Sequence, residues 1–292
     1  MNGLSDLAAL IARHAPSDGE HRTVLERVAL IRSSARTEPL HTLYEPSCCI
    51  VAQGRKRAAI GDVMHVYDAS RYLIVGVELP TVGAVVEASP DAPYLCLRLQ
   101  LDRAVLADMM MDPAPQRGDA RGSGVATATP ELIDAAVRLL KFLDSPEDAA
   151  TLAPLYEREI LHRLLSGPSG EILRQIANGG SHLNQIRRVV AFMRRNYGTP
   201  FAVEDLAAMA GMSQSSFFEH FRAVTAMSPL QFRNRIRLQE ARRLMVVEGV
   251  TAAEAGFRVG YESPSQFSRA YARVYSAPPR SDVTRMTARR SA

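Results

Sequence analysis

The sequence has few cysteines and no long hydrophobic run, and each absence excludes a class of protein. Three cysteines in 292 residues, an odd and low number, argue against the disulfide framework of a secreted protein, so we expect a cytoplasmic protein. Because no apolar run is long enough to span a membrane, no membrane partner is expected. The first residues, MNGLSDLAALIARHAPSDGEHR, have no basic segment before their short apolar run, which predicts an amphipathic helix and not a signal peptide.

Patterns that mark enzymes are also missing. The chain contains no glycine-rich phosphate loop, no Gly-x-Ser-x-Gly turn and no Cys-x-x-Cys pair. Asp62, His65 and Asp68 lie close together in the sequence, but no partner residues accompany them in an arrangement that would make them catalytic. We therefore expect no enzymatic activity, no metal site and no cofactor.

Basic residues are distributed unevenly, although the net charge of the whole chain is only +4. Residues 181–292 contain 17 Arg, no Lys and 8 acidic residues, a net charge of +9, which leaves −5 for the rest of the chain. A basic half joined to an acidic half is typical of a nucleic-acid-binding domain attached to a different partner domain. A basic surface without a ligand is the alternative that charge alone leaves open.

Residues 39–101 predict β-structure. Short runs rich in Val, Ile, Leu and Tyr are separated by turn signals, and strands at this spacing indicate a small barrel or sandwich. The last run alternates between an apolar and a more polar face, which could line a pocket. The apolar face consists of Leu95, Leu97, Leu99 and Leu101, and the polar face of Tyr94, Cys96, Arg98 and Gln100.

The chain after residue 101 predicts a loop and then helices. Residues 111–128 are rich in Pro, Gly and Ala and predict a mobile loop. Thr129-Pro130 and Ser145-Pro146 each place a capping residue before a proline at the first helical position. The segment IANGGSH, at 176–182, is the predicted domain linker, with Ser181 capping the next helix.

The basic half contains an internal repeat. The segment AGMSQSSFFEHFRAVTAMSP at 210–229 resembles VGYESPSQFSRAYARVYSAPP at 259–279. The residues that match at an offset of 50 are Ser213 with Ser263, Phe217 with Phe267, Phe221 with Tyr271, and Pro229 with Pro279. In each copy a short helix ends at a Gly suited to a left-handed backbone and a Ser caps the next helix, the pattern of a helix-turn-helix. The segment Ser263–Gln266 (SPSQ) also predicts a capping box.

Outward-facing side chains on the second helix of each copy are candidates for DNA contact. The aromatic pairs at i,i+4 face the core, which leaves polar and arginine side chains outside for base and phosphate contact. The predicted contacts are Gln214, Ser215, Phe218, Glu219 and Arg222 in the first copy, and Ser265, Ser268, Arg269 and Arg273 in the second. A long helix over 228–245 would fix their spacing, so that one chain could address two successive major-groove segments. A helical bundle without a DNA role is the alternative, which two matched copies disfavour.

These segments carry a family resemblance. The sequence AGFRVGYESPSQFSRAYARVYSAPP closely resembles the second helix-turn-helix signature of AraC/XylS-type transcription regulators, and the first copy with the long helix resembles the first motif and linker. Upstream, YEPSCCIVAQGRKR, YLIVGVELP and PYLCLRL resemble the cupin-like N-terminal domain of one subgroup. The resemblance, over about residues 40–283, implies an α+β protein. A cupin-like β-barrel with a helical layer precedes an all-α domain of two helix-turn-helix motifs joined by a long linker helix.

The domain boundaries and partners follow from this resemblance. We expect a sensor or dimerisation domain at 1–178, with the barrel at 39–101 and helices at 102–178, a DNA-binding domain at 181–285 and a flexible tail at 286–292. The family implies a bacterial regulator that binds double-stranded promoter DNA and recruits or blocks RNA polymerase. Base contacts in the family come from the outward faces of both recognition helices. Carried over to this sequence, the resemblance implies contacts by Gln214, Ser215, Phe218 and Glu219 in the first copy, and by Ser265, Gln266, Ser268 and Arg269 in the second.

One recognition position departs from the family pattern. The first recognition helix has Glu219 where the family usually has Arg. A glutamate can only accept hydrogen bonds from bases, and it repels phosphate, whereas an arginine can pair with guanine. We therefore expect the first copy to bind DNA more weakly or with a different preference, and the second copy, with Arg269, to dominate.

Two other roles stay open for the N-terminal half. A barrel of this type can hold a metal in an enzyme, but metal-binding cupins resemble each other in a His-x-His pattern, and the strand region has only His41 and His65. The half could also form a homodimer without binding an effector, and the apolar candidates for this contact are Leu132, Val137, Leu140, Leu155, Ile160 and Leu164. The same helices could instead cover the barrel of their own chain.

The adjacent cysteines Cys48 and Cys49 lie in a predicted strand. Side chains alternate between faces along a strand, so the two thiols point to opposite faces and cannot easily bridge. Burial of both is expected, because CCIVAQ is apolar on both faces. If the barrel holds a pocket, only one of them faces it, with Cys96 and Tyr94 as neighbours. These four residues are the candidates for sensing an unknown small-molecule or electrophile effector.

Overall fold

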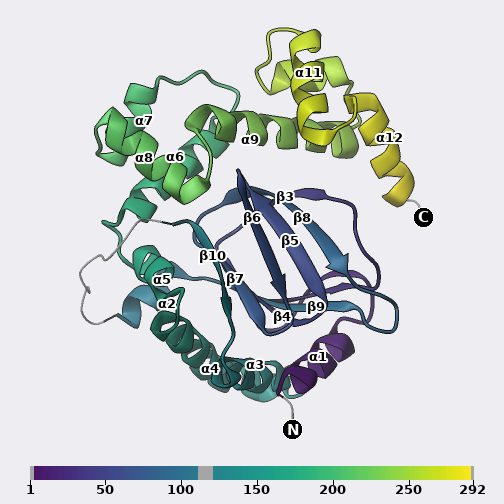
Figure 1. The fold of residues 1–292 in the computed structure, drawn as a ribbon, viewed down its shortest axis with the longest axis vertical. Helices are drawn as coiled ribbons and strands as arrows, with labels where there is room; N and C mark the ends of the chain where they lie inside the picture. Colours follow the sequence, from purple (N-terminus) through teal and green to yellow (C-terminus); the bar gives the residue numbers. More distant parts are fainter. Residues whose placement is uncertain (1–2, 111–120, 291–292) are drawn as a thin grey trace. The chain divides into compact units, whose positions relative to one another are not determined.

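The computed structural model describes residues 3–110 and 121–290. The chain divides into two compact units: Met1–Arg187 with Glu219–Ala226, and Arg188–Phe218 with Met227–Ala292. The first unit contains two β-sheets with helices, and the second contains the repeated motifs except for residues 219–226 of the first copy, which belong to the first unit (Figure 1). The α+β fold class predicted from the sequence is confirmed.

The described part of the first unit contains two antiparallel sheets. One has six strands in the order β1-β2-β9-β4-β7-β10, and the other has four in the order β3-β8-β5-β6. Between β3 and β9 the chain passes repeatedly from one sheet to the other, which is how two sheets come to share a core. The strands are β1 (Gly19–Arg22), β2 (Val28–Ser33), β3 (Leu40–Tyr44), β4 (Ser47–Gln53), β5 (Arg55–Ile60), β6 (Val63–Asp68), β7 (Arg71–Val75), β8 (Leu79–Glu87), β9 (Tyr94–Gln100) and β10 (Ser123–Thr127).

Helices α1 to α5 also belong to the first unit and form an arc along one side of the strands (Figure 1). Helix α1 packs against β2, β4 and β9, and α3 packs against α1 and α4. Thr129 caps α3 by accepting a hydrogen bond from the Leu132 amide at 3.3 Å, with Pro130 at the first helical position. The helices are α1 (Gly3–His14), α2 (Arg103–Asp108), α3 (Pro130–Lys141), α4 (Pro146–Ser166) and α5 (Gly170–Ala177).

The strands extend beyond the range expected from the sequence. Strands β1 and β2 precede residue 39, and β10 lies within residues 111–128, which were expected to be a mobile loop. The first part of that segment, 111–120, lies outside the described residues. Strand β10 has the sequence SGVAT, which carries no alternating apolar pattern, and its strand conformation comes from pairing with β7 along its whole length. The loop prediction is therefore wrong for Ser123–Thr127.

The apolar residues proposed for a dimer contact are mostly buried within a single chain. Among the six candidates, Leu132, Val137, Leu140, Ile160 and Leu164 are each less than 9% exposed. Only Leu155, with 60% of its surface exposed, is available to another molecule. The helices that carry these residues therefore bury most of this apolar surface within their own chain, where α3 packs against α1 and α4.

The two helix-turn-helix copies begin with the turns that the sequence predicts. Gly211 follows α7 with φ of 70°, and Gly260 follows α10 with φ of 86°, a left-handed conformation that glycine adopts without strain. Ser213 and Ser263 then accept hydrogen bonds from the amides of Ser216 and Gln266. The helices are α6 (His182–Arg195), α7 (Val203–Ala210), α8 (Gln214–Thr225), α9 (Pro229–Arg243), the π-helix η1 (Leu244–Glu248), α10 (Ala252–Arg258), α11 (Pro264–Tyr275) and α12 (Pro279–Arg290).

Three details at helix ends differ from the sequence predictions. The capping box predicted at Ser263 is present only as the serine half, whereas a complete box joins Ser228 and Gln231 at the start of α9. Ser145 precedes α4 without a side-chain capping bond. Helix α12 continues to Arg290, through most of the segment predicted to be a flexible tail.

Candidate nucleic-acid interface and effector pocket

The second helix of each repeat, α8 and α11, has one buried aromatic face. Phe217, Phe221, Phe267 and Tyr271 are fully buried, with no exposed surface. Because these pairs are spaced at i,i+4, they occupy one stripe of each helix and leave the opposite stripe outside. The four aromatic residues lie where the sequence predicts.

Nearly all of the residues proposed for DNA contact lie on the outer stripe. All five candidates of α8 are exposed, and in α11 only Ser268 is half-buried. Phe218 exposes 44% of its surface, an unusual exposure for an aromatic side chain and one suited to contact with a base or sugar. The remaining exposed candidates are Gln214, Ser215, Glu219, Arg222, Ser265, Gln266, Arg269 and Arg273.

The two recognition helices differ in the charge that they present. In the described part of the chain, neither Arg269 nor Arg273 of α11 forms an ion pair with a carboxylate. Their guanidinium groups are therefore available to guanine or phosphate. On α8, by contrast, Glu219 is exposed, and Gln214 donates a hydrogen bond to Glu204 of α7 at 3.0 Å.

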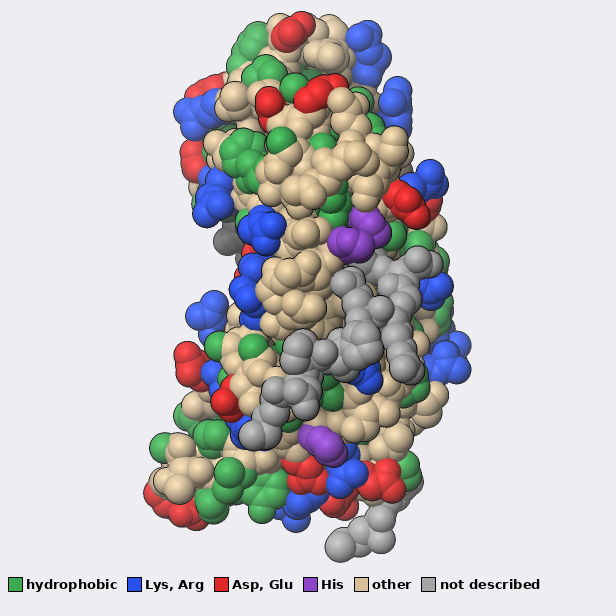
Figure 2. Space-filling view, turned by 90° about the vertical axis from the view of Figure 1, so that its left-hand side faces the viewer, with side chains coloured by type: hydrophobic (Ala, Val, Ile, Leu, Met, Phe, Trp, Pro, Cys, Tyr) green, Lys and Arg blue, Asp and Glu red, His purple; other side chains and the backbone are tan. Residues whose placement is uncertain are grey.

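The face of the molecule drawn in Figure 2 carries both charges. On the face that Figure 2 draws, Lys and Arg side chains are interspersed with Asp and Glu side chains. A net positive charge therefore does not by itself define a binding surface on this face. The case for DNA contact depends on the recognition helices and not on a general basic surface.

Arg237, in the middle of α9, connects the linker helix to both repeats. Its Nε donates to the carbonyl of Tyr197 at 2.6 Å, and its two terminal nitrogens donate to the carbonyls of Gly198 and Gly260 at 3.2 and 3.1 Å. Residues 197–198 precede α7, and Gly260 is the turn glycine of the second repeat. Figure 1 shows α7 near one end of α9, and α11 and α12 near the other. Arg237 is only 8% exposed and acts as a structural arginine that the sequence did not distinguish from its exposed neighbours.

Asp282 of α12 holds the second repeat together. Its carboxylate is fully buried and accepts two hydrogen bonds from Arg242 of α9, at 2.7 and 3.0 Å. It also accepts one from the Tyr271 hydroxyl at 2.8 Å and one from Arg285 at 2.9 Å. Although burial opposes the ionised form, these donors lower the pKa of Asp282 below its ordinary value. A charged, fully bonded carboxylate thus joins α9, α11 and α12.

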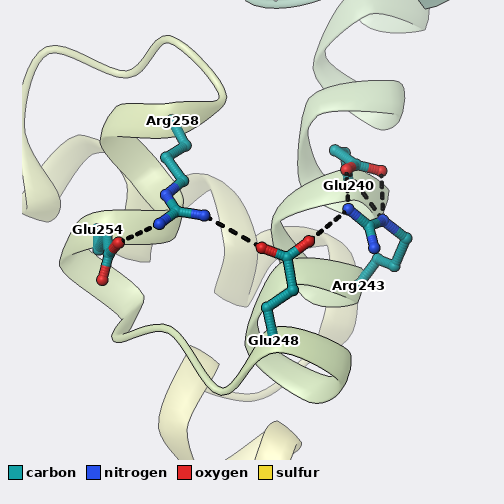
Figure 3. Close-up of polar contacts among 5 residues, drawn as sticks. All are labelled: Glu240, Arg243, Glu248, Glu254 and Arg258. Carbon is teal, nitrogen blue, oxygen red and sulfur yellow. Dashed lines mark hydrogen bonds and ion pairs between the residues drawn. The ribbon is translucent and has the colours of Figure 1, made fainter.

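A chain of exposed ion pairs links the end of α9 to α10 (Figure 3). Arg243 pairs with Glu240 at 2.8 Å and with Glu248 at 2.9 Å, and Glu248 in turn contacts Arg258 at 3.1 Å. Arg258 also pairs with Glu254, one turn earlier on α10. Because the side chains are exposed, each pair contributes little stability, at most about 1 kcal/mol.

A cavity of about 640 Å³ lies within the first unit, between residues of the two sheets. Its wall combines apolar side chains with several charged ones. Arg98 pairs with Glu20 at 2.7 Å and Arg32 lies 3.9 Å from Asp18, so two of its three cations have carboxylate partners. The lining residues are Asp18, Gly19, Glu20, Ile31, Arg32, Ser33, Thr37, Leu40, Thr42, Leu43, Tyr44, Glu45, Ser47, Cys49, Lys56, Gly83, Val85 and Arg98.

Lys56 is the third cation of this wall, and the sequence did not indicate it. It is half-buried, and its ammonium lies 5.4 Å from the ring centre of Tyr44 and 5.9 Å from that of Tyr94. No carboxylate of the described residues pairs with it. Although burial opposes its charge, the phenol of Tyr44 and the nearby thiols raise the pKa of Lys56, so the amine stays protonated.

The three cysteines, all free thiols, occupy different environments. Cys49 is 7% exposed and lines the cavity, whereas Cys48 and Cys96 have no exposed surface. Cys49 lies opposite Arg98 across the β4–β9 ladder, and Cys96 lies opposite Val51, two residues further along the same face. Cys48 points to the other face of the sheet, the face against which α1 packs. The structure therefore places Cys49, and not Cys48, beside Cys96 and the cavity.

The pKa of Cys49 is unusual for a buried thiol. A hydrogen bond with Cys96 lowers it most, burial raises it, and the charges of Lys56 and Arg98 lower it further, to about 7. The pKa of Cys96 is raised well above its ordinary value by the same hydrogen bond and by burial. Burial also raises the pKa of Cys48. A substantial fraction of Cys49 is therefore a thiolate at neutral pH, while its two neighbours stay protonated.

The remaining polar residues of the sequence analysis do not form a catalytic or metal-binding group. His65 Nε2 lies 3.0 Å from the Ser123 hydroxyl, and burial lowers the pKa of His65. Asp68 pairs with Arg55 and Arg71, both at 3.5 Å. In the described ranges, no three His, Cys, Asp or Glu side chains lie together as a metal site would require, and no helix is long and apolar enough to cross a membrane.

The comparisons with known proteins match both halves of this architecture. Residues 24–172 match the family model for the N-terminus of AraC-type transcriptional regulators, and residues 206–285 match the model for a helix-turn-helix domain. The chain belongs to the AraC family of transcription regulators. As a member of this family, the protein combines the N-terminal domain of AraC-type transcriptional regulators with a helix-turn-helix domain, the architecture that the sequence predicts.

Individual relatives of this AraC-family protein cover it only in part. It is 26% identical over 159 residues to the HTH-type transcriptional regulator ExsA of Pseudomonas aeruginosa. This match covers 53% of this chain and 55% of ExsA. It is 34% identical over 91 residues to the RCS-specific HTH-type transcriptional activator RclR of Escherichia coli, or 31% of this chain and 32% of RclR. The chain thus spans about half or less of these relatives.

A solved structure matches nearly the whole fold. The crystal structure of an apo ToxT variant from Vibrio cholerae covers 91% of this chain and 99% of its own, with a TM-score of 0.56. The sequence identity is 10%, so this likeness concerns the fold alone. It confirms the predicted order of an N-terminal cupin-like domain of sheets and helices followed by an all-helical domain.

Proposed function

We propose that this AraC-family protein is a sequence-specific regulator of bacterial promoters in the cytoplasm, controlled by a small molecule that binds its N-terminal domain. The observation that carries the first part is the pair of recognition helices, each with a buried aromatic face and an exposed polar face. Arg237, bonded to the backbone beside both repeats, supports a fixed spacing between them. Two helices at a fixed spacing can enter successive major-groove segments of one duplex.

The first proposal is tested by in vitro selection of bound DNA from a random pool, repeated at two salt concentrations. We expect enrichment of one sequence that persists at the higher salt, because base contacts do not depend on released counterions as phosphate contacts do. Binding that enriches no sequence and disappears at the higher salt would mean a merely basic protein. RNA polymerase is the proposed second partner, to be recruited or blocked at the selected site.

Control by a small molecule is supported by the cavity of about 640 Å³ in the first unit. A cavity of this size can enclose a metabolite-sized molecule, and its mixture of apolar and charged side chains is typical of ligand sites. The test is the melting temperature of the protein in a screen of small molecules. A ligand that binds the folded state raises the melting temperature, whereas a scaffold without an effector site responds to none.

An N-terminal half that serves only for dimerisation is the second candidate. The exposure of Leu155, and of Leu152 beside it on α4 at 37%, favours some contact of this kind. A possible homodimer is compatible with effector binding, so the two roles do not exclude each other. Sedimentation analysis of the wild type and of Leu155→Asp tests the dimer contact. Loss of a dimer in the variant would assign this face to self-association, and a wild type that stays monomeric would rule the contact out.

A further inference from the structure

The thiol of Cys49 lies in a setting that its two neighbours lack. It contacts the cavity, it faces a cation that has no carboxylate partner among the described residues, and a second thiol, Cys96, lies on the same face of the sheet. Cys48, the adjacent residue, has none of these features because it points to the other face of the strand. Cys48 is therefore a natural control for Cys49, because the two thiols are adjacent in the sequence but only that of Cys49 reaches the cavity.

We propose that Cys49 is the reactive residue of an electrophile receptor, and that an α,β-unsaturated carbonyl compound enters the cavity and is captured covalently by this thiol. The inference rests on the proposed control by a small molecule, and it names the chemical class of that molecule. The cavity of about 640 Å³ leaves room for such a compound between the sheets. An apolar chain could lie against Leu40, Leu43 and Val85, which also line the cavity.

The reaction needs no oxidant and no cofactor. The Cys49 thiolate forms a carbon–sulfur bond with the β-carbon of the compound, and the electron pair of its double bond moves to give an enolate. A proton from the solvent or from Lys56 then reaches the α-carbon, so that a sulfur and a hydrogen have added across the double bond. The ammonium of Lys56 is the group that can stabilise the negative charge on the enolate oxygen.

A thiol with this environment is more reactive than a surface thiol at neutral pH. The pKa of Cys49 is lowered to about 7, so more of it is thiolate at neutral pH than of an ordinary cysteine, and the thiolate is the nucleophile. Its limited exposure, 7%, means that a compound must enter the cavity before it reacts. The position of Cys49 in the cavity wall therefore accounts both for the reactivity of its thiol and for the selection of compounds that fit the cavity.

The test is the reaction of the intact full-length protein with methyl vinyl ketone, followed by intact mass measurement and peptide mapping. We expect a single adduct, at Cys49, in the folded protein and three adducts in urea. Cys48→Ser, the matched control on the opposite face, should keep the single adduct, and Cys49→Ser should lose it. Faster or equal labelling of Cys48 or Cys96 in the folded wild type would overturn the proposal, as would an unreacted Cys49, and neither result requires a variant to fold.

The role of Lys56 has a separate readout. In the wild type the labelling rate should rise with pH with a midpoint near 7, the pKa of Cys49. Lys56→Met removes a positive charge beside the thiol, so the midpoint should move to higher pH. A midpoint raised by about one pH unit should lower the labelling rate at pH 7 by about fivefold, because the fraction of thiolate falls from about one half to about one tenth. An unchanged pH profile in Lys56→Met would exclude the electrostatic contribution of this lysine.

The failure of this inference can be distinguished from the failure of the proposed function. The labelled and unlabelled proteins are compared for affinity to the DNA site obtained by selection. A protein that binds the selected site but is never labelled at Cys49 refutes the electrophile receptor and leaves the regulator standing. A protein labelled at Cys49 that selects no DNA sequence refutes the regulator. If labelling changes DNA affinity in the wild type and not in Cys49→Ser, both hold.

Discussion

The two helix-turn-helix copies form the same backbone pattern with different side chains. At the offset of 50 residues, the buried Tyr271 and Asp282 of the second copy correspond to Phe221 and Phe232 of the first. The first copy is thus closed by apolar packing, whereas the second is closed by a buried carboxylate bonded to Arg242 and Tyr271. Their outer faces also differ, because the first presents Glu219 where the second presents Arg269.

The two copies therefore differ both in what stabilises them and in what they present to DNA. The second copy carries the exposed arginines that DNA contact requires, and it depends on a charged buried group for its packing. The first copy has the apolar Phe232 in place of the buried carboxylate, and its recognition helix presents Glu219 in place of an arginine. We expect each copy to respond to a different kind of perturbation, and the predictions below test that expectation.

The largest effect is expected from Asp282→Ala. Its removal leaves the partly buried guanidinium of Arg242 and the hydroxyl of Tyr271 without their acceptor, which should lower the free energy of unfolding by about 3–5 kcal/mol. Urea unfolding followed by circular dichroism measures the change. Glu248→Gln, in the exposed ion-pair chain, serves as the control. A loss below about 1 kcal/mol in Asp282→Ala would mean that the buried carboxylate does not hold the second copy together.

The same carboxylate predicts a dependence of stability on pH. The folded-state pKa of Asp282 lies below its unfolded value, so its contribution to stability is complete above about pH 5 and is lost as the pH falls through 4 and below. Asp282→Asn cannot ionise. The stability difference between the wild type and Asp282→Asn should therefore shrink from pH 6 to pH 3. A difference that stays constant over this range would show that the charge of Asp282 is not what stabilises the second copy.

Arg269→Ala should have the largest effect on DNA recognition. Loss of an arginine that pairs with guanine costs about 1–3 kcal/mol of specific binding, measured as fluorescence anisotropy with the selected duplex. Arg57→Ala, an exposed arginine on the outer face of β5, is the control and should bind normally. Normal binding by Arg269→Ala, combined with weak binding by Gln214→Ala and Ser215→Ala, would reverse the ranking of the two copies.

Glu219→Gln should strengthen binding to DNA by a smaller amount. Glu219 is exposed on the recognition helix of the first copy, where a carboxylate repels phosphate. Removing its charge should raise the affinity up to about tenfold at low salt and steepen the dependence of affinity on salt by about one unit. Glu26→Gln, in the first unit, removes an exposed carboxylate elsewhere and should leave the affinity unchanged. Equal gains in both variants would reflect net charge alone.

The smallest effect is expected in the ion-pair chain of Figure 3. Glu248 bridges Arg243 and Arg258 on the surface, so Glu248→Gln should change the free energy of unfolding by less than about 1 kcal/mol. High salt should remove even this difference, because exposed pairs are screened. A change comparable to that of Asp282→Ala would contradict the distinction between buried and exposed charges in the second copy.

The helix-turn-helix copies could be predicted from the sequence because their determinants are local. A glycine that ends one helix, a serine that caps the next and an aromatic pair at i,i+4 are all read within about 20 residues, and Gly211, Ser213 and Phe217 take the predicted positions. The alternation of β9 also predicted which face would meet the cavity. Local patterns do not reveal contacts made between distant segments.

The roles of residues that are set by such distant contacts could not be predicted from the sequence. Lys56 lies in a basic run, RKR, that is typical of an exposed loop, and its neighbours Arg55 and Arg57 are indeed exposed. Only the pairing of β5 with β6 and β8 turns Lys56 inward. Arg237 likewise resembles the other arginines of α9 until the carbonyls of residues 197–198 are placed beside it. Strand β10 exists through its pairing with β7 and not through its own propensity.

The central claim is that two unequal recognition helices read one DNA site. Parallel in vitro selection with the wild type and with Arg269→Ala tests it most directly. We predict that the wild type enriches two short blocks about 10 base pairs apart, and that the variant loses the sequence preference of one block while keeping the other. An identical enriched sequence in both proteins, or a single uninterrupted block that the variant loses completely, would contradict the account.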